Sequence, residues 1–149
     1  MNIEEEIKAS KMNNSKRAII NIIYTSNFLV DEISYVLKPY DLSLQQFNVL
    51  RILNGRKDEP ANLSFIQDRM ISKMSNTSRL VDKLIQKELV NRHICQQNRR
   101  KVEIFITPKG KNLLGKVNSL IDDKEIQLTK GISDKDLEHI NALLNNLRT

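Results

Sequence analysis

The chain has 149 residues, enough for one domain with a substantial hydrophobic core and too few for two ordinary domains. Apolar residues make up 40% and charged residues 28% of it, with a formal net charge of +6 and only three prolines and four glycines, a composition that argues against long disordered segments. It has no apolar run near the ~18 residues of a membrane span, and its start, MNIEEEIK, lacks the apolar core of a signal peptide, so we expect a cytoplasmic protein with no membrane partner.

The first predicted element is a long amphipathic helix from about residue 14 to residue 38. Its apolar residues recur at helical spacing: Ala18, Ile19, Ile22, Ile23, Leu29, Ile33, Val36 and Leu37. Pro39 ends it, because proline lacks an amide hydrogen and disfavours helical geometry in the residue before it. A second helix is expected to begin after Ser43, which forms a capping box with Gln46, and to stop near Gly55.

Two short helices separated by a break near Ser72 are expected next. The first contains Leu63, Ile66 and Met70, and the pair Ser64 and Gln67 matches a second capping box. The second runs to Lys87 and carries its own helical stripe: Ser78, Val81, Leu84 and Ile85.

Two strand-like runs follow these helices. Val102, Ile104 and Ile106 alternate with Glu103, Phe105 and Thr107, and the run from Leu89 to Cys95 has the same character. β-branched residues at a period of two indicate strands. The polar stretch from Gln96 to Lys101 joins the two runs, so the sequence predicts a hairpin whose tip carries three cations and no acid.

Two more helices complete the predicted order. Thr107 before Pro108 is a strong helix start, because threonine caps free amides and proline at the first helical position has no amide to leave unpaired. This helix is expected to break near Gly131, and Ser133 with Asp136 caps a last helix. The apolar residues of the last helix are spaced three, four and three apart: Leu137, Ile140, Leu144 and Leu147.

Positive charge is concentrated in the segment from residue 73 to residue 101. It has eight cations, namely Lys73, Arg79, Lys83, Lys87, Arg92, Arg99, Arg100 and Lys101, against the two acids Asp82 and Glu88. Eight minus two is +6, which equals the charge of the whole chain. Such asymmetry is typical of a phosphate-binding face, although a solvated helix and turn would also produce it.

Two short helices, a tight turn and a basic hairpin in this order predict a helix-turn-helix motif with a wing. A helix fits the major groove of DNA, while a narrow two-stranded tip reaches an adjacent minor groove or the backbone. The predicted recognition helix carries polar and cationic residues in its first two turns and one cation further on: Lys73, Ser75, Asn76, Ser78, Arg79 and Lys83. Arginine can bond guanine, asparagine can pair with adenine, and serine can donate or accept, so these side chains are candidates for reading base edges.

From about Leu42 to Leu114 the sequence resembles the multiple-antibiotic-resistance regulator (MarR) family of bacterial winged helix-turn-helix repressors. The resemblance rests on the stretch SRLVDKLIQKELVNRHICQQNRRKVEIFITPKG, Ser78 to Gly110. The matching residues are Arg79, Leu80, Val81, Asp82, Leu84, Leu89, Val90, Arg92, Arg100, Thr107 and Gly110. The implied fold is mainly α with a small β-hairpin wing, in which residues 42–107 form the DNA-binding lobe.

The resemblance also implies how the remaining parts are used. Helices within 14–38 and 108–149 would interleave with those of a second copy, with Leu137, Ile140, Leu144 and Leu147 at the interface, although a monomer could bury such stripes internally. The wing tip would consist of Asn98, Arg99, Arg100 and Lys101, with Arg100 entering a minor groove. The dimer would bind double-stranded DNA at a palindromic operator, as a repressor released by a small aromatic or phenolic molecule bound between the dimer helices and the lobe.

Two residues depart from the family pattern. Glu88 stands where the family usually has glycine, so the turn needs either another geometry or a non-glycine residue at positive φ. Asn98 replaces an aspartate that in relatives pairs with the arginine two residues on. Its amide can hold Arg100 through a hydrogen bond without a charge.

Several features of the sequence bear on functions other than DNA binding. A winged-helix module that binds a protein is the main alternative, but it has no need of three clustered cations at the wing. No phosphate loop, paired-carboxylate motif or nucleophile elbow points to an enzyme, and no cofactor is indicated. Cys95 is the only cysteine and fits inert packing better than redox sensing. His93, Cys95 and His139 are too few for a closed zinc site.

Overall fold

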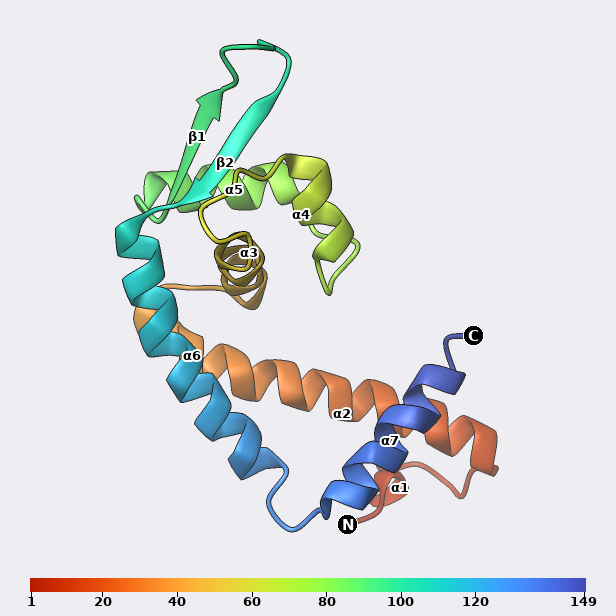
Figure 1. The fold of residues 1–149 in the computed structure, drawn as a ribbon. Helices are drawn as coiled ribbons and strands as arrows, with labels where there is room; N and C mark the ends of the chain where they lie inside the picture. The colour runs from red at the N-terminus through yellow and green to blue at the C-terminus, as the bar shows by residue number, and fades with distance from the viewer.

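The computed structural model describes residues 1–149 and consists of helices with a single two-stranded hairpin. In chain order the elements are α1 (Ile3–Glu6), α2 (Asn14–Leu37), the 3-10 helix η1 (Lys38–Tyr40), α3 (Leu44–Asn54), α4 (Leu63–Arg69), α5 (Thr77–Gln86), β1 (Val90–Ile94), β2 (Val102–Ile106), α6 (Pro108–Leu128) and α7 (Asp134–Asn146). Figure 1 shows a lobe of α3, α4, α5 and the hairpin at the top, with the N-terminus at the opposite end and the C-terminus at mid-height on the right. The predicted order of elements is confirmed from α2 onward, whereas α1 and η1 were not predicted.

Side-chain caps begin most of these helices, because they satisfy amides that have no partner inside the helix. Ser43 and Gln46 form the predicted capping box, with Ser43 Oγ accepting from Gln46 N at 3.0 Å. The predicted box at Ser64 is wrong. Asn62 caps α4 instead, its Oδ1 accepting from the amide of Phe65 at 2.7 Å, and Ser64 lies inside the helix. Asparagine caps a helix as well as serine does, and here it comes two residues earlier.

The hydrophobic core lies inside the lobe and around α3. Its buried residues come from nearly every element: Leu37, Leu42, Phe47, Val49, Leu50, Leu53, Ala61, Ile66, Met70, Val81, Leu84, Leu89, Val90, Ile104, Ile106, Leu114, Val117 and Ile121. The end of α2 and the part of α6 as far as Ile121 therefore pack onto the core, and this packing fixes where both long helices leave the lobe.

The hairpin is antiparallel, with Val90 opposite Ile106 and Ile94 opposite Val102. A third extended residue joins it: Ala61, in the loop before α4, exchanges backbone hydrogen bonds of 3.0 and 2.8 Å with Ile104. The base of the hairpin is thus held by the lobe, while its tip projects beyond it (Figure 1).

The turn between α5 and β1 shows how the chain accommodates Glu88. This residue has a φ of 61°, in the left-handed region that non-glycine residues rarely adopt. Thr107 holds it there, since the hydroxyl donates to the carbonyl oxygen of Glu88 at 2.8 Å. Next to it Gly110 is required, because a Cβ there would lie 2.3 Å from the carbonyl oxygen of Leu89.

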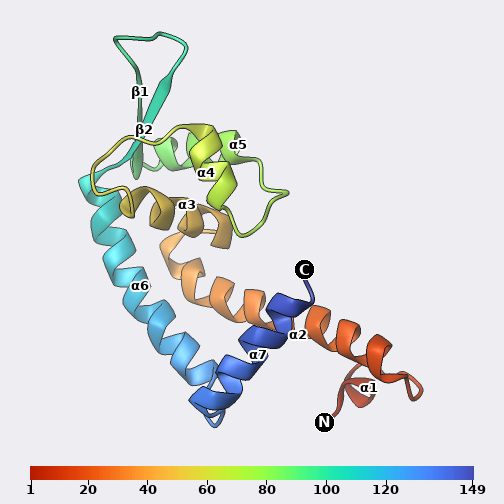
Figure 2. The same cartoon turned by 45° about the vertical axis from the view of Figure 1, so that its right-hand side comes forward.

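Away from the lobe, α2 and α6 spread apart and α7 turns back from the far end of α6 (Figure 2). Glu32 on α2 and Lys124 on α6 form an ion pair of 2.9 Å. The short α1 folds onto α2, where a hydrogen bond from Arg17 (Nε to Oε1, 2.6 Å) lowers the pKa of Glu4. None of the helices combines the length and apolar character needed to cross a bilayer.

Large apolar side chains remain exposed on the surfaces of the long helices and α7. They include Ile19, Ile22, Ile23, Phe28 and Leu29 on α2, and Ile140 and Leu143 on α7 with Leu147 at its end. No residue of α7 is buried within the single chain. An uncovered apolar surface of this kind marks an interaction site.

Candidate nucleic-acid interface

The predicted recognition helix corresponds to α5. Thr77, Val81 and Leu84 are buried on its inner face, which leaves the opposite face to solvent. The helix begins later than predicted, because Asn76 is its N-cap and accepts from the amide of Arg79 at 3.1 Å. Lys73 and Ser75 therefore precede the helix and lie in the turn after α4.

Hydrogen bonds hold this turn against α4. The side chain of Gln67 donates to the carbonyl oxygen of Lys73 at 3.1 Å and accepts from the hydroxyl of Thr77. The ammonium of Lys73 donates to the carbonyl oxygen of Asp68, and the hydroxyl of Ser75 is buried without a partner. Ser75 is thus directed into the protein, whereas Lys73 stays exposed with its ammonium bound to a backbone carbonyl oxygen.

The other predicted residues of this helix face solvent. Asn76, Ser78, Arg79 and Lys83 are all exposed. No acidic side chain pairs with Arg79 or Lys83, since neither takes part in any of the seven ion pairs of the chain. The two cations are one helical turn apart, so they lie on the same side of α5.

The wing tip is a tight turn that exposes its three cations. The carbonyl oxygen of Asn98 accepts from the amide of Lys101 at 2.9 Å, and its side-chain Oδ1 accepts from the amide of Arg100 at 3.1 Å. Asn98 therefore holds the backbone of Arg100 and leaves the guanidinium free. The side chains of Arg99, Arg100 and Lys101 are exposed and have no acidic partner.

Contacts at the base of the hairpin connect the wing to the helix. Arg92 on β1 forms an ion pair of 2.8 Å with Asp82 on α5. The rings of His93 and Phe105 pack across the two strands with their centroids 5.8 Å apart. Cys95 is half-buried just beyond β1, and no three His, Cys, Asp or Glu side chains gather closely enough to hold a metal ion. Helix and wing consequently present their exposed cations as parts of one connected unit.

Comparison with known proteins identifies the family. The MarR family model matches residues 42–102. The HTH-type transcriptional regulator TcaR of Staphylococcus aureus is 32% identical over 107 residues, which cover 70% of this chain and 69% of TcaR. The chain belongs to the MarR family.

Solved structures of MarR regulators share this fold. The Staphylococcus aureus MepR–DNA complex superposes with a TM-score of 0.77 at 21% identity, over 92% of this chain and 97% of MepR. The organohalide-sensing regulator RdhR, in its 2,4-dichlorophenol-bound form, gives a TM-score of 0.84 at 15% identity, over 93% of this chain and 81% of RdhR. At such identities the two comparisons confirm the winged-helix fold.

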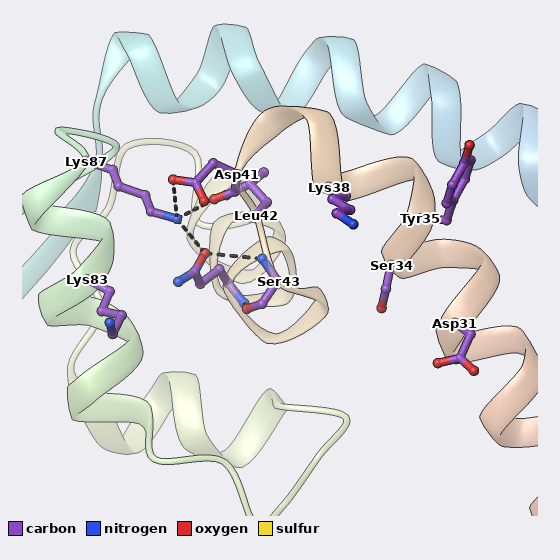
Figure 3. A pocket seen from close by; sticks show the side chains of 10 residues that line it. Asp31, Ser34, Tyr35, Lys38, Asp41, Leu42, Ser43, Lys83 and Lys87 are labelled. Carbon is purple, nitrogen blue, oxygen red and sulfur yellow. Dashed lines mark hydrogen bonds and ion pairs between the residues drawn. The ribbon is translucent and has the colours of Figure 1, made fainter.

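This MarR-family chain has an open cavity between the lobe and the end of α2, with a volume of about 670 Å³. Side chains from α2, η1, the start of α3 and the end of α5 line it, among them Tyr35, Lys38, Lys83 and Lys87 (Figure 3). The sequence placed an effector in this region but did not identify these residues, since they come from four separate segments. Only Lys83 was among the predicted site residues.

Proposed function

We propose that this chain is a sequence-specific DNA-binding transcriptional regulator that works as a homodimer in the cytoplasm, and that it is not an enzyme. The observation that carries the proposal is the set of exposed cations without acidic partners on α5 and the wing: Arg79, Lys83, Arg99, Arg100 and Lys101. They belong to two elements joined by the Arg92–Asp82 ion pair, and they would neutralise phosphates over one continuous face.

The roles of individual side chains follow from their positions. Arg79 is suited to guanine in the major groove, and Ser78 to either a donor or an acceptor on a base edge. Asn76 uses Oδ1 to cap α5, which leaves its amide NH₂ free to donate to a base. Arg100, with Arg99 beside it, would enter a minor groove, where narrow A·T-rich sequence concentrates negative potential.

Dimerisation accounts for the apolar surface that the single chain leaves exposed. Residues 42–107 would form the DNA-binding lobe, and the helices within 14–38 and 108–149 would pair with those of a second copy. Leu137, Ile140, Leu144 and Leu147 would lie in that interface. One recognition helix and one wing contact few base pairs, whereas two related by a two-fold axis read a palindrome.

The cavity beside α2 supports regulation by a small molecule. RdhR has been solved with 2,4-dichlorophenol bound, and an aromatic or phenolic effector is proposed here as well. Ammonium groups of Lys38 and Lys83 line the cavity without an acidic partner, so a phenolate or an aromatic carboxylate would suit it. Because Lys83 belongs to α5, such a ligand would compete with DNA, which is the behaviour of a repressor released by its effector.

Selection of bound sequences from a random duplex pool tests the function directly. We expect a palindromic consensus whose half-sites are about one helical turn, ~34 Å, apart. If the protein retains no more DNA than it retains of an acidic polymer of matched charge, the result would instead favour the protein-interaction module. An enriched site without two-fold symmetry would keep DNA binding and reject the dimer.

A further inference from the structure

Lys87 is the one lysine of the basic segment that connects the recognition helix to the joint between α2 and α3. It follows the last residue of α5, and its ammonium makes three contacts with the joint between α2 and α3 (Figure 3). It donates to the carbonyl oxygen of Asp41 and, at 3.0 Å, to Oε1 of Gln46. The carboxylate of Asp41 lies 3.4 Å away.

The acceptors of this contact belong to a constrained turn. Asp41 closes η1 with a φ of 52°, in the left-handed region, and so sets the direction in which the chain leaves α2. Gln46 is only 7% exposed, and its Oε1 also accepts from the amide of Ser43 at 3.2 Å in the capping box of α3. One ammonium therefore ties the end of α5 to the point where α2 meets the lobe.

Lys83, one turn earlier on the same helix, differs from Lys87 in this respect. Its side chain lines the same cavity but takes part in no hydrogen bond or ion pair. The Lys87 side chain is 27% exposed, and its ammonium is already shared among three oxygen atoms. Lys83 is thus free to meet a phosphate, whereas Lys87 is engaged within the protein.

The angle at this joint has a large effect further along the chain. The 24 residues of α2 span ~36 Å at 1.5 Å per residue. Seen from the lobe, a rotation of ~10° about the joint would therefore move the far end of α2 by roughly 6 Å. In a dimer joined through its long helices, such a change of angle alters where the second lobe lies relative to the first.

We infer that Lys87 is a positioning residue, which fixes the angle between the DNA-reading lobe and α2 and thereby the half-site spacing that a dimer accepts. This inference rests on the proposed function, because only a dimeric DNA-binding protein has a half-site spacing. Lys87 thus fixes the angle between the lobe and α2 and does not contact phosphate, although it belongs to the same basic segment of the sequence as the other cations.

The test compares Lys87→Met with Lys83→Met in the full chain, because both variants remove one positive charge from α5. Binding is titrated on duplexes whose half-sites are identical and whose spacing differs by up to two base pairs either way, at several salt concentrations. For Lys87→Met we expect the preference for the best spacing to fall roughly tenfold while the salt slope stays that of the parent protein. For Lys83→Met we expect the spacing preference to persist and the slope to fall.

Gln46→Met provides a second variant, because it removes an acceptor of the Lys87 ammonium without changing the charge. It should also relax the spacing preference and keep the parent slope. The inference is overturned if folded Lys87→Met keeps the parent spacing preference, if its salt slope falls as that of Lys83→Met does, or if it binds no duplex at all. Should Lys87→Met not fold, an unchanged spacing preference in Gln46→Met would overturn it equally. Failure of the parent protein to bind any palindrome would instead reject the proposed function itself.

Discussion

The division of the basic segment into free and engaged cations predicts which of them control the salt dependence of DNA binding. Arg99 at the wing tip has no acidic partner, whereas Arg92 at the wing base is 2.8 Å from Asp82. Replacing either arginine by glutamine removes one charge from each protomer. Only Arg99→Gln should reduce the number of counterions that DNA releases on binding.

The magnitude follows from the number of contacts. Each neutralised phosphate contributes about 0.9 to the slope of log affinity against log salt, so losing one contact per protomer lowers the slope of a dimer by ~1.8. If all five free cations of each protomer met phosphates, the slope of the parent dimer would reach roughly 9. Arg92→Gln should leave the slope within experimental error of the parent value.

Fluorescence anisotropy with a labelled operator between 50 and 300 mM salt would measure these slopes. Circular dichroism would establish that both variants keep the fold. Equal slope reductions in the two variants would refute the distinction between free and engaged cations. A parent protein whose affinity does not change with salt would refute phosphate contact altogether.

Two further predictions concern the dimer and the turn at Glu88. Ile140→Asp combined with Leu144→Asp should give folded monomers, because each apolar side chain buried in an interface contributes about 1.5 to 3 kcal/mol. Sedimentation would detect the monomers, and they should bind the palindrome hardly better than random DNA. A monomer that binds the palindrome tightly would contradict this. Glu88→Gly should raise the free energy of unfolding by about 1 kcal/mol and the melting temperature by roughly 2 to 4 °C, because glycine adopts positive φ without strain. An unchanged or lower melting temperature would show that the left-handed turn carries no strain.

The helix starts were predictable because capping is local chemistry. Ser43, Thr107 and Ser133 accept hydrogen bonds from amides three residues on, at the positions that the sequence indicated. The prediction that Ser64 caps α4 was wrong because Asn62 and Ser64 lie two residues apart and both residue types cap helices well. No local rule ranks Asn62 above Ser64. The predicted period of two likewise located both strands of the hairpin.

Tertiary contacts of long side chains could not be predicted in the same way. The ammonium of Lys73 bonds to a backbone carbonyl five residues earlier, and that of Lys87 reaches Asp41, 46 residues away. Lysine has many rotamers, so its partner depends on which oxygen atoms the fold brings near. Charge counting therefore located the basic face but could not tell its free cations from its engaged ones.

The freedom of Arg100 leads to the last prediction, for Asn98→Asp. In the structure the Asn98 side chain binds only the backbone amide of Arg100, so the guanidinium must be ordered when it enters a minor groove. Ordering a long side chain costs up to about 1.5 to 2 kcal/mol. A carboxylate at position 98 would pair with the guanidinium and reduce this cost, because the Arg100 side chain would already be partly ordered before DNA binds.

The added negative charge would oppose DNA binding, but an exposed charge near two arginines in 0.15 M salt should cost less than about 1 kcal/mol. We therefore expect Asn98→Asp to bind an operator with A·T-rich flanks about two- to fivefold more tightly and to discriminate more strongly against G·C-rich flanks. Asn98→Ala is the matched control: it leaves the Arg100 amide without its partner and should weaken binding to both flank types. If Asn98→Asp weakens binding equally on both, the guanidinium is not ordered by position 98, and repulsion from phosphate outweighs any preorganisation of the wing.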